Sequence, residues 1–384
     1  MRILLVSDFY PPNQGGLEGH VARLAAHLAD RGHEVAVATG GAHGGHSSTM
    51  DGPVLVSRLP LALERLPVYT TNRAYHPPWP DPAFVRALLA MARRFQPDVI
   101  HAHGWCEFSA AAVARRLDVP VVVTLHDYGL RCPSKTLRCG DRPCRRTLGL
   151  CCLTCWHSDQ GLAKRTGLAA AIKLGRGKVA GRISRFLAVS HYVARAHLCA
   201  GIGEESDYRV VPNFVDTPAG PISAPESAER PILFVGPTLP RAGRTVLETA
   251  HDALPAEDRP PLSLIDAEDE AGADPDAYRD ASMIVVPSLW PDPCPTVALE
   301  AMAAGRPVIA SAVGGLTDLV EPGVTGMLVP PGEPDALTDA MRTLAGDPEL
   351  AAKLGAAGRD RVVQRFSAAA VIPQVEAAYQ EVLA

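Results

Sequence analysis

Two carboxylates, Asp292 and Glu300, are the residues of this chain whose type and spacing are best suited to chemistry. Seven residues separate them in the segment PDPCPTVALE. Asp292 stands in a proline-rich loop, and Glu300 stands about one turn into the helix expected after it. Carboxylates accept hydrogen bonds from hydroxyl groups, whereas the unpaired N–H groups of Thr296 and Val297 at the helix start favour an anion such as phosphate. Sugar hydroxyls, ribose hydroxyls and phosphate together indicate a nucleotide sugar.

The elements around these acids form a strand–helix–strand unit. The apolar run from Ile284 to Pro287 has the length and β-branched content of a buried strand. Good helix formers extend from Thr296 to Ala304 and stop at Gly305, and Pro307 to Ala310 is a second buried strand before the tight turn Gly314-Gly315. Loops at the carboxyl ends of strands form the ligand crevice of an open α/β sheet, so we expect both acids to face one pocket.

A similar unit opens the chain. Arg2 to Ser7 has the pattern of a buried strand, Gly15 and Gly16 lie in the loop after it, and a helix beginning near Leu17 leads to the strand Glu34 to Thr39. Glycines allow the backbone to approach a ligand closely, and the helix start supplies N–H groups for an anion. A plain tight turn is the alternative interpretation of the glycine pair.

The segment around the two acids resembles the donor-site signature of GT-B retaining glycosyltransferases of family 4. In that signature two Glu residues with seven residues between them are followed by Ala-Met-Ala. By this resemblance Glu300 binds the donor ribose, and Asp292, a shorter acid, takes the place of the Glu that holds sugar hydroxyls. The usual Gly between them is Pro295, which has no N–H to donate. An ordinary strand–helix–strand unit with surface acids is the alternative interpretation.

The start of the chain resembles the start of the same family. The match includes the run Arg31-Gly32-His33-Glu34-Val35, which closes the first strand–helix–strand unit. In the family the glycine loop faces the acceptor and the donor phosphate. The resemblance therefore implies this role for Gly15 and Gly16.

A histidine after a strand of the first half also matches the family. The segment Thr124-Leu125-His126-Asp127 follows the family pattern and implies that His126 contacts the donor sugar. A satisfied structural histidine is the alternative interpretation. His101, His103 and Trp105 are candidates for the acceptor side. This region has no carboxylate nucleophile, which is consistent with the front-face retention proposed for the family.

The second half departs from the family at its first strand, Pro231 to Gly236. Relatives have an Arg directly after the Gly and a Lys five residues further on, and these two cations hold the donor diphosphate. Pro237 and Ala242 take those places here. Because neutralising a departing diphosphate is a large electrostatic contribution, we consider Arg241 and Arg244 as replacements. The loss also motivates an alternative, a catalytically degenerate GT-B protein that binds a sugar ligand or supports a partner enzyme.

A cysteine cluster lies in the first half, within positions 132–157. Its members are Cys132, Cys139, Cys144, Cys151, Cys152 and Cys155. Four residues separate Cys139 from Cys144 and two separate Cys152 from Cys155, and structural zinc sites use such spacings. Reduced buried thiols are the main alternative, and disulfides would require an oxidising compartment. Either way, we expect the cluster to brace a loop over the acceptor pocket and not to take part in the chemistry.

The resemblance predicts an α/β GT-B fold, in which two Rossmann-like domains face each other across a cleft. We place an acceptor-binding domain at 1–215, a linker at 216–230, a donor-binding domain at 231–365, and at 366–384 a helix that crosses back to the first domain. Only twelve residues separate Ile265 from Tyr278, where relatives have an additional strand and helix. The second domain is therefore expected to be abbreviated, with a smaller or differently built base pocket.

Composition restricts the classes of partner. A net charge of -5 over 384 residues argues against a nucleic-acid-binding protein. No apolar run approaches the roughly 20 residues of a membrane span, and the start of the chain does not have a signal-peptide pattern, so a cytoplasmic location is expected. Seven basic residues between Lys164 and Arg185 allow at most peripheral membrane contact, and the solvated face of a helix is the simpler interpretation.

These observations converge on one hypothesis. The chain is expected to be a retaining glycosyltransferase that moves a sugar, a hexose or a related one, from a nucleotide-sugar donor to a small or medium-sized molecule or a glycan. The chemistry requires no metal or other cofactor, since helix N-termini and cationic side chains can carry the phosphate charge. A sugar-nucleotide epimerase on the same fold is a third reading, which the acid pair and its surroundings disfavour.

Overall fold

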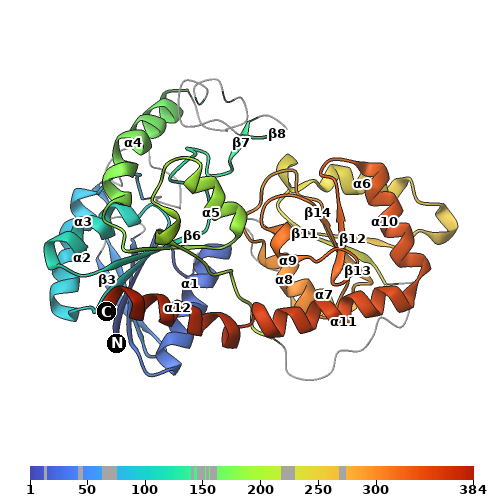
Figure 1. Cartoon of the computed structure of the whole chain (residues 1–384). Helices are drawn as coiled ribbons and strands as arrows, with labels where there is room; N and C mark the ends of the chain where they lie inside the picture. Colours follow the sequence, from blue (N-terminus) through green and yellow to red (C-terminus); the bar gives the residue numbers. More distant parts are fainter. Residues whose placement is uncertain are drawn as a thin grey trace.

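The computed structural model shows two α/β domains side by side, coloured blue to green and yellow to red in Figure 1. It describes residues 1–12, 15–41, 46–62, 76–139, 142–144, 152, 155, 162–217, 230–267 and 274–384. Most of the expected linker 216–230 and most of the cysteine-rich segment 132–157 beyond Cys139 lie outside these ranges. None of the described helices is both long enough and apolar enough to cross a bilayer.

The first domain is built on an eight-stranded sheet in the order β10-β9-β6-β5-β1-β2-β4-β3, in which only β3 runs antiparallel to its neighbour. Its strands are β1 (Arg2–Ser7), β2 (Glu34–Gly40), β3 (Ser47–Asp51), β4 (Val54–Leu59), β5 (Val99–His103), β6 (Val121–Leu125), β9 (Arg185–Ala188) and β10 (Tyr208–Val210). The helices are α1 (Gly16–Asp30), α2 (Pro82–Phe95), α3 (Glu107–Leu117), α4 (Leu162–Ala180) and α5 (His191–Leu198). A separate short hairpin joins β7 (Arg138–Cys139) to β8 (Arg142–Pro143).

The second domain has a five-stranded, fully parallel sheet in the order β12-β11-β13-β14-β15. Its strands are β11 (Ile232–Gly236), β12 (Leu262–Asp266), β13 (Met283–Val286), β14 (Val308–Ser311) and β15 (Gly326–Val329). Its helices are α6 (Arg244–Asp252), α7 (Pro275–Asp280), α8 (Thr296–Ala303), α9 (Leu316–Leu319), α10 (Pro334–Gly346) and α11 (Pro348–Arg365). Because buried parallel strands have no solvent-facing side, the fully buried β11, β13 and β14 are nearly continuous apolar runs, whereas the edge strand β12 is partly exposed and carries Ser263 and Asp266.

The last helix, α12 (Ala368–Leu383), returns to the first domain, where Figure 1 shows it beneath the sheet. It packs against the same apolar cluster as β1 and α1. The Tyr379 hydroxyl lies 2.7 Å from Nδ1 of His101, and Arg31 donates two hydrogen bonds to the carboxylate of Glu376. These contacts attach the end of the chain to its beginning.

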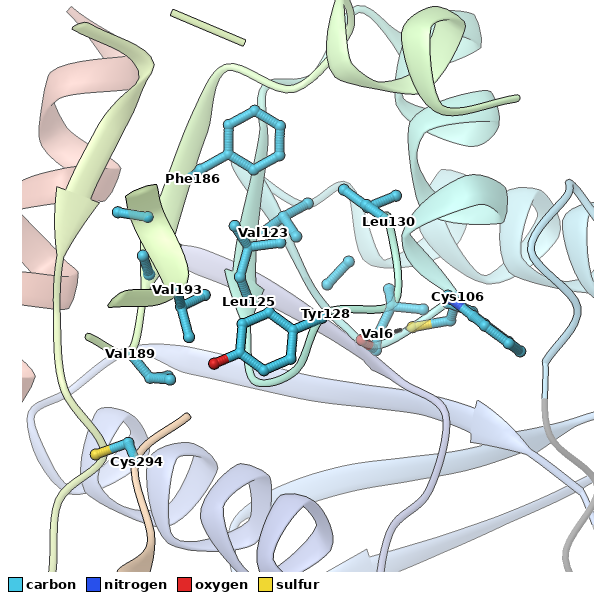
Figure 2. Close-up of a cluster of buried hydrophobic side chains, with 14 of the residues drawn as sticks. Val6, Cys106, Val123, Leu125, Tyr128, Leu130, Phe186, Val189, Val193 and Cys294 are labelled. Carbon is cyan, nitrogen blue, oxygen red and sulfur yellow. Dashed lines mark hydrogen bonds between the residues drawn. The ribbon is translucent and has the colours of Figure 1, made fainter. Parts of the chain in front are cut away.

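The two domains also touch near the carboxyl ends of their sheets. The buried Tyr128 hydroxyl donates a hydrogen bond of 2.6 Å to the carbonyl of Pro291, and Nδ2 of Asn213 donates one to the carbonyl of Cys294. Figure 2 shows Tyr128 close to Leu125, with Cys294 on the segment contributed by the second domain. The loop after β13 is thereby held against the loop after β6.

The expected α/β architecture of two parallel-sheet domains is confirmed, and element boundaries differ by a few residues. Strand β13 begins at Met283 and ends at Val286, because Pro287 has no N–H with which to continue a ladder. Helix α12 begins at Ala368, two residues into the expected range 366–384, because the Ser367 side chain accepts a hydrogen bond from the N–H of Ala370 and caps the helix there.

Candidate active site

The second domain carries a pocket at the carboxyl end of its sheet. The pocket encloses about 590 Å³, part of it open to solvent, which is within the usual size of a small-molecule site. The ends of β11, β12 and β13 and the first turn of α8 surround it. The lining residues are Phe234, Val235, Gly236, Pro237, Arg241, Ala242, Ala267, Val286, Pro287, Ser288, Trp290, Asp292, Pro295, Thr296 and Val297. This is the edge at which open α/β sheets bind ligands.

Asp292 reaches the pocket from the loop after β13. Its carbonyl accepts a hydrogen bond of 2.7 Å from the N–H of Gly315, and its side chain is 7% exposed. Gly314 has a φ of 62°, and a Cβ atom at Gly314 or Gly315 would collide with the backbone of residues 291–293. The double glycine therefore lets the turn after β14 hold this acidic loop in place.

The first turn of α8 forms one wall of the pocket. Thr296 and Val297 both line it, and within the described residues Ala298 is the first of this helix whose N–H finds a backbone acceptor, the carbonyl of Pro295. The N–H groups of Thr296 and Val297 thus have no backbone partner within the described part of the chain. Such a helix start attracts an anion through its free donors and its dipole.

Glu300 lies one turn further along α8 and does not line the pocket. The buried Tyr278 of α7 donates a hydrogen bond of 2.6 Å to its Oε2. Burial raises the pKa of Glu300, while the Tyr278 hydrogen bond and the nearby Arg23 guanidinium oppose that increase. Arg23 belongs to α1 of the first domain, so charged residues of both domains influence this site. The structure brings Asp292, Thr296 and Val297 together and places Glu300 beside them.

The two candidate arginines have different surroundings. Arg241 lines the pocket with its guanidinium 5.7 Å from the centre of the Trp290 ring. Arg244 lies in the first turn of α6, and its Nε donates a hydrogen bond of 2.9 Å to Glu248. Pro237 and Ala242, which replace the family's two cations, also line the pocket. Among the positions considered from the sequence, Arg241 is therefore the one that brings positive charge to the pocket.

Three histidines of the first domain meet at the carboxyl end of its sheet. His103 ends β5, His126 follows β6, and His20 lies in the second turn of α1. Nδ1 of His103 is 3.0 Å from Nε2 of His126, and the ring centres of His20 and His126 are 4.8 Å apart. Burial lowers the pKa of His126 to about 4 and lowers the pKa values of His20 and His103 well below the ordinary value. All three rings are therefore neutral near pH 7.

His101 and Trp105 have structural surroundings that do not match the acceptor-side role expected for them. His101 is fully buried, with Nδ1 2.7 Å from the Tyr379 hydroxyl and Nε2 2.7 Å from the Thr124 hydroxyl, so neither ring nitrogen is available to a ligand. Trp105 is 6% exposed, and its Nε1 donates a hydrogen bond to the Gly129 carbonyl. His101 and His103 are two residues apart on β5 and point to the same face of the sheet, and His101 lies in the part of that face that Tyr379 of α12 covers.

The glycine loop begins α1 as expected. Gly15 is the residue before the helix and Gly16 is its first residue. A Cβ atom on Gly15 would collide with the carboxylate of Glu18, which is buried in the first turn. Glycine at this position therefore leaves room for the Glu18 side chain to fold back over the loop. The loop's role toward acceptor and phosphate stays a prediction.

The proposed zinc ligands cannot be assembled from the described residues. Cys144, Cys152 and Cys155 are partly buried, and Sγ of Cys155 donates a hydrogen bond of 3.4 Å to the carbonyl of Arg138. The side chain of Cys139 and all of Cys151 lie outside the described part of the chain. Structural zinc at the four cysteines stays a prediction.

Two family models match this chain. The model described as Glycosyltransferase Family 4 matches residues 14–218, more than half of the chain, and the model described as Glycosyl transferases group 1 matches residues 270–361. The chain belongs to glycosyltransferase family 4. The second match contains both Asp292 and Glu300, and the first contains the glycine loop and the histidines.

Curated relatives of this glycosyltransferase match it along nearly the whole chain. The glycogen synthase of Mycobacterium tuberculosis is 27% identical over 95% of this chain and 91% of its own length. The D-inositol 3-phosphate glycosyltransferase of Saccharomonospora viridis is 29% identical over 92% of this chain and 86% of its own. The resemblance to family 4 seen in the sequence is confirmed, and the chain is a glycosyltransferase that uses a nucleotide-sugar donor.

Solved structures confirm the GT-B fold. Sucrose-phosphate synthase from Thermosynechococcus elongatus superposes with a TM-score of 0.72 at 22% identity, covering 99% of both chains. Anabaena HepE in complex with UDP superposes with a TM-score of 0.66 at 19% identity, covering 99% of this chain and all of that one. At these identities the likeness establishes the fold, with two Rossmann-like domains.

Sequence reasoning missed three residues that this glycosyltransferase brings to the groove. Tyr278 holds Glu300, Arg23 lies near the same carboxylate, and His20 joins the histidine pair. His20 could have been noticed from the sequence, because it is a polar residue on the apolar, buried face of α1, beside Val21 and Leu24. Tyr278 and Arg23 carried no such signal, because their partners are distant in sequence.

Proposed function

We propose that this glycosyltransferase retains the anomeric configuration of the sugar that it moves from a nucleoside diphosphate donor to a hydroxyl of a small or medium-sized acceptor. The observation that supports this proposal most is the meeting of an acid, a cation and a free helix start at one pocket. Asp292, Arg241 and the first turn of α8 all line it. A hydroxyl-rich sugar on a diphosphate matches that combination of groups.

The donor diphosphate is assigned to the first turn of α8. The N–H groups of Thr296 and Val297 donate to phosphate oxygens there, and Arg241 supplies the charge that the family's missing Arg and Lys supply elsewhere. Asp292 accepts hydrogen bonds from the sugar hydroxyls. Glu300, oriented by Tyr278, accepts from the ribose where the nucleotide leaves the pocket. These groups stabilise the departing diphosphate more than the bound donor, since its charge increases as the bond breaks.

The first domain supplies the acceptor side. In the proposed reaction the bond between the anomeric carbon and the diphosphate oxygen breaks, and the acceptor oxygen bonds to the same face of that carbon. The acceptor proton passes to the departing phosphate oxygen. His126, a neutral ring at the edge of the first sheet, contacts the donor sugar, and His103 positions it through their 3.0 Å hydrogen bond.

The Anabaena neighbour was solved in complex with UDP and with UDP-glucose, which makes UDP-glucose the first donor to test here. A cytoplasmic location is part of the same proposal and has no separate support from the structure. Because Pro237 and Ala242 replace the family's two cations, the alternative is a degenerate protein that binds a donor and does not transfer its sugar.

The experiment measures binding, donor hydrolysis and transfer with UDP-glucose and a panel of hydroxyl acceptors. Asp292→Ala and Glu300→Ala should each weaken donor binding or abolish transfer. Asp339→Ala is the control, because Asp339 is an exposed acid of α10 that pairs only with Arg342 among the described residues. Donor binding that is the same in all three variants would reject the pocket. Tight binding without transfer to any acceptor would support the degenerate alternative.

A further inference from the structure

The three histidines at the edge of the first sheet have the composition of a metal site. One ring nitrogen each from His20, His103 and His126 lies within 4.8 Å of the other two. The residues come from three elements that the sheet brings together: β1 pairs with β5, β5 pairs with β6, and α1 follows β1. No other group of three metal-ligating side chains was found at this spacing among the described residues.

Two nitrogens of this cluster have no partner. Nδ1 of His20 and Nε2 of His103 are buried, and neither makes a hydrogen bond within the described part of the chain. The two residues are 6% and 0% exposed. Buried polar atoms are nearly always hydrogen-bonded, and each one that is not requires an explanation. His101, the neighbouring histidine, has both nitrogens paired, whereas Nε2 of the buried His197 is also without a partner among the described residues, so the cluster is distinguished by the approach of three rings and not by unpaired nitrogens alone.

The spacing is close to that of a coordinated ion. Zinc–nitrogen bonds of about 2.0–2.1 Å in tetrahedral geometry place ligand nitrogens roughly 3.3 Å apart. Nδ1 of His103 is 3.0 Å from Nε2 of His126, and one nitrogen of His20 lies within 4.8 Å of one nitrogen of each of the other two rings. In this arrangement Nδ1 is the His103 ligand, and the unpartnered Nε2 is the other nitrogen of that ring. His126 is only partly buried and leaves a route from the groove for the ion and for a fourth ligand.

We propose that His20, His103 and His126 bind one divalent transition-metal ion of the class that favours imidazole, such as Zn²⁺ or Co²⁺. Magnesium and calcium do not fit, because they require oxygen ligands and the three residues offer nitrogen alone. The charged side chains near the cluster have both signs, so they neither exclude nor strongly attract a cation. Arg23 lies near His20, and Lys135 and Asp127 lie near His126. The ion competes with the hydrogen bond between His103 and His126.

The ion would act as an inhibitor of transfer, a consequence that rests on the proposed function. Coordination occupies the nitrogen of His126 and fixes its ring, so that this residue no longer contacts the donor sugar. Metal binding itself is measured without donor or acceptor. Failure of the metal site is therefore distinguishable from failure of the transferase assignment.

The test titrates Co²⁺ into the metal-free full-length chain, without an affinity tag, and records its visible absorption. Nitrogen ligands give Co²⁺ bands in the visible range, whereas cysteine thiolates add a strong near-ultraviolet charge-transfer band. The variant His20→Phe keeps a ring of similar shape beside Phe214, 5.1 Å away, and removes one ligand. We expect this variant to bind at least about tenfold more weakly. His191→Gln, at an exposed histidine of α5, should bind like the native chain.

Equal affinity in the native chain and in His20→Phe would overturn the proposal, as would a spectrum with only thiolate-bound cobalt or no binding at all. Thermal unfolding establishes that each variant is folded. If His20→Phe does not fold, His20→Asn takes its place, and the same loss of affinity is required of it.

Discussion

The two edges that face the groove follow one plan and present different chemistry. In each domain a parallel sheet ends in loops that carry the candidate residues. In the first domain the strand ends and loops carry neutral imidazoles, of which the buried His103 and the partly buried His126 touch. In the second they carry acids, the arginine Arg241 and a helix start. Twelve of the thirteen histidines precede residue 231, and His251 is the exception.

This difference suggests a division of labour. A diphosphate carries charge, and the second domain has a helix start and a cation at its pocket, which are groups suited to stabilise such a charge. The first domain has rings that are neutral at pH 7 and therefore shape and orient without attracting a second anion. Four measurements test this contrast between the domains, and the largest effect is expected from acid.

Acid should destabilise the first domain before the second. Burial lowers the pKa values of His126 and His197 to about 4 and of His101 to about 3, below the ordinary 6.5. Between pH 6.5 and the lowered pKa of each histidine, the unfolded chain binds more protons than the folded chain. The contribution of these histidines to the free energy of unfolding is therefore fully present above pH 6.5 and is lost as the pH decreases. Each such histidine costs about 1.4 kcal/mol per pH unit, or about 2 kcal/mol from pH 6.5 to 5.

Hydrogen exchange at pH 7 and pH 5 locates this effect, and urea unfolding measures it. His197→Gln should remove about 2 kcal/mol of the pH dependence, calculated from the same shift. His251→Gln, in the second domain, should leave the pH dependence unchanged. If the second domain opened first at pH 5, the proposed contrast between the domains would be wrong.

Asp292→Ala should reduce kcat/KM by about 100-fold, because hydrogen bonds to a charged group contribute roughly 1.5–3 kcal/mol each. Steady-state kinetics with UDP-glucose measures the change. Asp292→Glu, which restores the acid of the family signature, should retain much more activity than Asp292→Ala. Identical kinetics in both variants would show that the carboxylate does not contact the sugar.

Arg241→Gln should weaken UDP binding by about tenfold, the loss expected for one charge-assisted contact to phosphate. Arg244→Gln is the matched control, since its guanidinium is paired with Glu248 outside the pocket. Calorimetric titration with UDP and with uridine separates the phosphate contribution from that of the base. A stronger effect at Arg244 would reverse the assignment of the cation.

Tyr278→Phe should have the smallest effect, about threefold to tenfold on UDP affinity and little on turnover, because its hydrogen bond acts on the nucleotide only through the orientation of Glu300, so that only part of its roughly 1.5–3 kcal/mol contributes to binding. It removes only the hydroxyl that orients Glu300. The same calorimetry checks it, and 2′-deoxy-UDP provides the second arm. If Glu300 binds the ribose, the variant and the deoxynucleotide should have less than additive effects.

Much of the fold could be predicted from local patterns. The apolar runs of β1, β11 and β13 are short, β-branched and bounded by polar or proline residues, so burial on both faces is readable from each run alone. Asp292, Thr296 and Val297 lie within five residues of sequence, and a loop entering a helix keeps them together. For the acceptor-side candidates the local sequence could not decide. His101 and His103 are two residues apart on β5 and share one face of the sheet, and nothing local tells that Tyr379 of α12 covers His101 while His103 meets His126.

By itself the sequence determined the family, the two-domain α/β plan and the acid, amide and glycine residues of the donor loop, because these signals are carried by neighbours along the chain. Only the tertiary structure decided that Arg241 and not Arg244 enters the pocket, that Tyr278 holds Glu300, and that His20 completes a trio with His103 and His126. Those pairings join residues from different elements. Their geometry depends on how strands are ordered in a sheet and on how helices pack over it, and no local pattern encodes either.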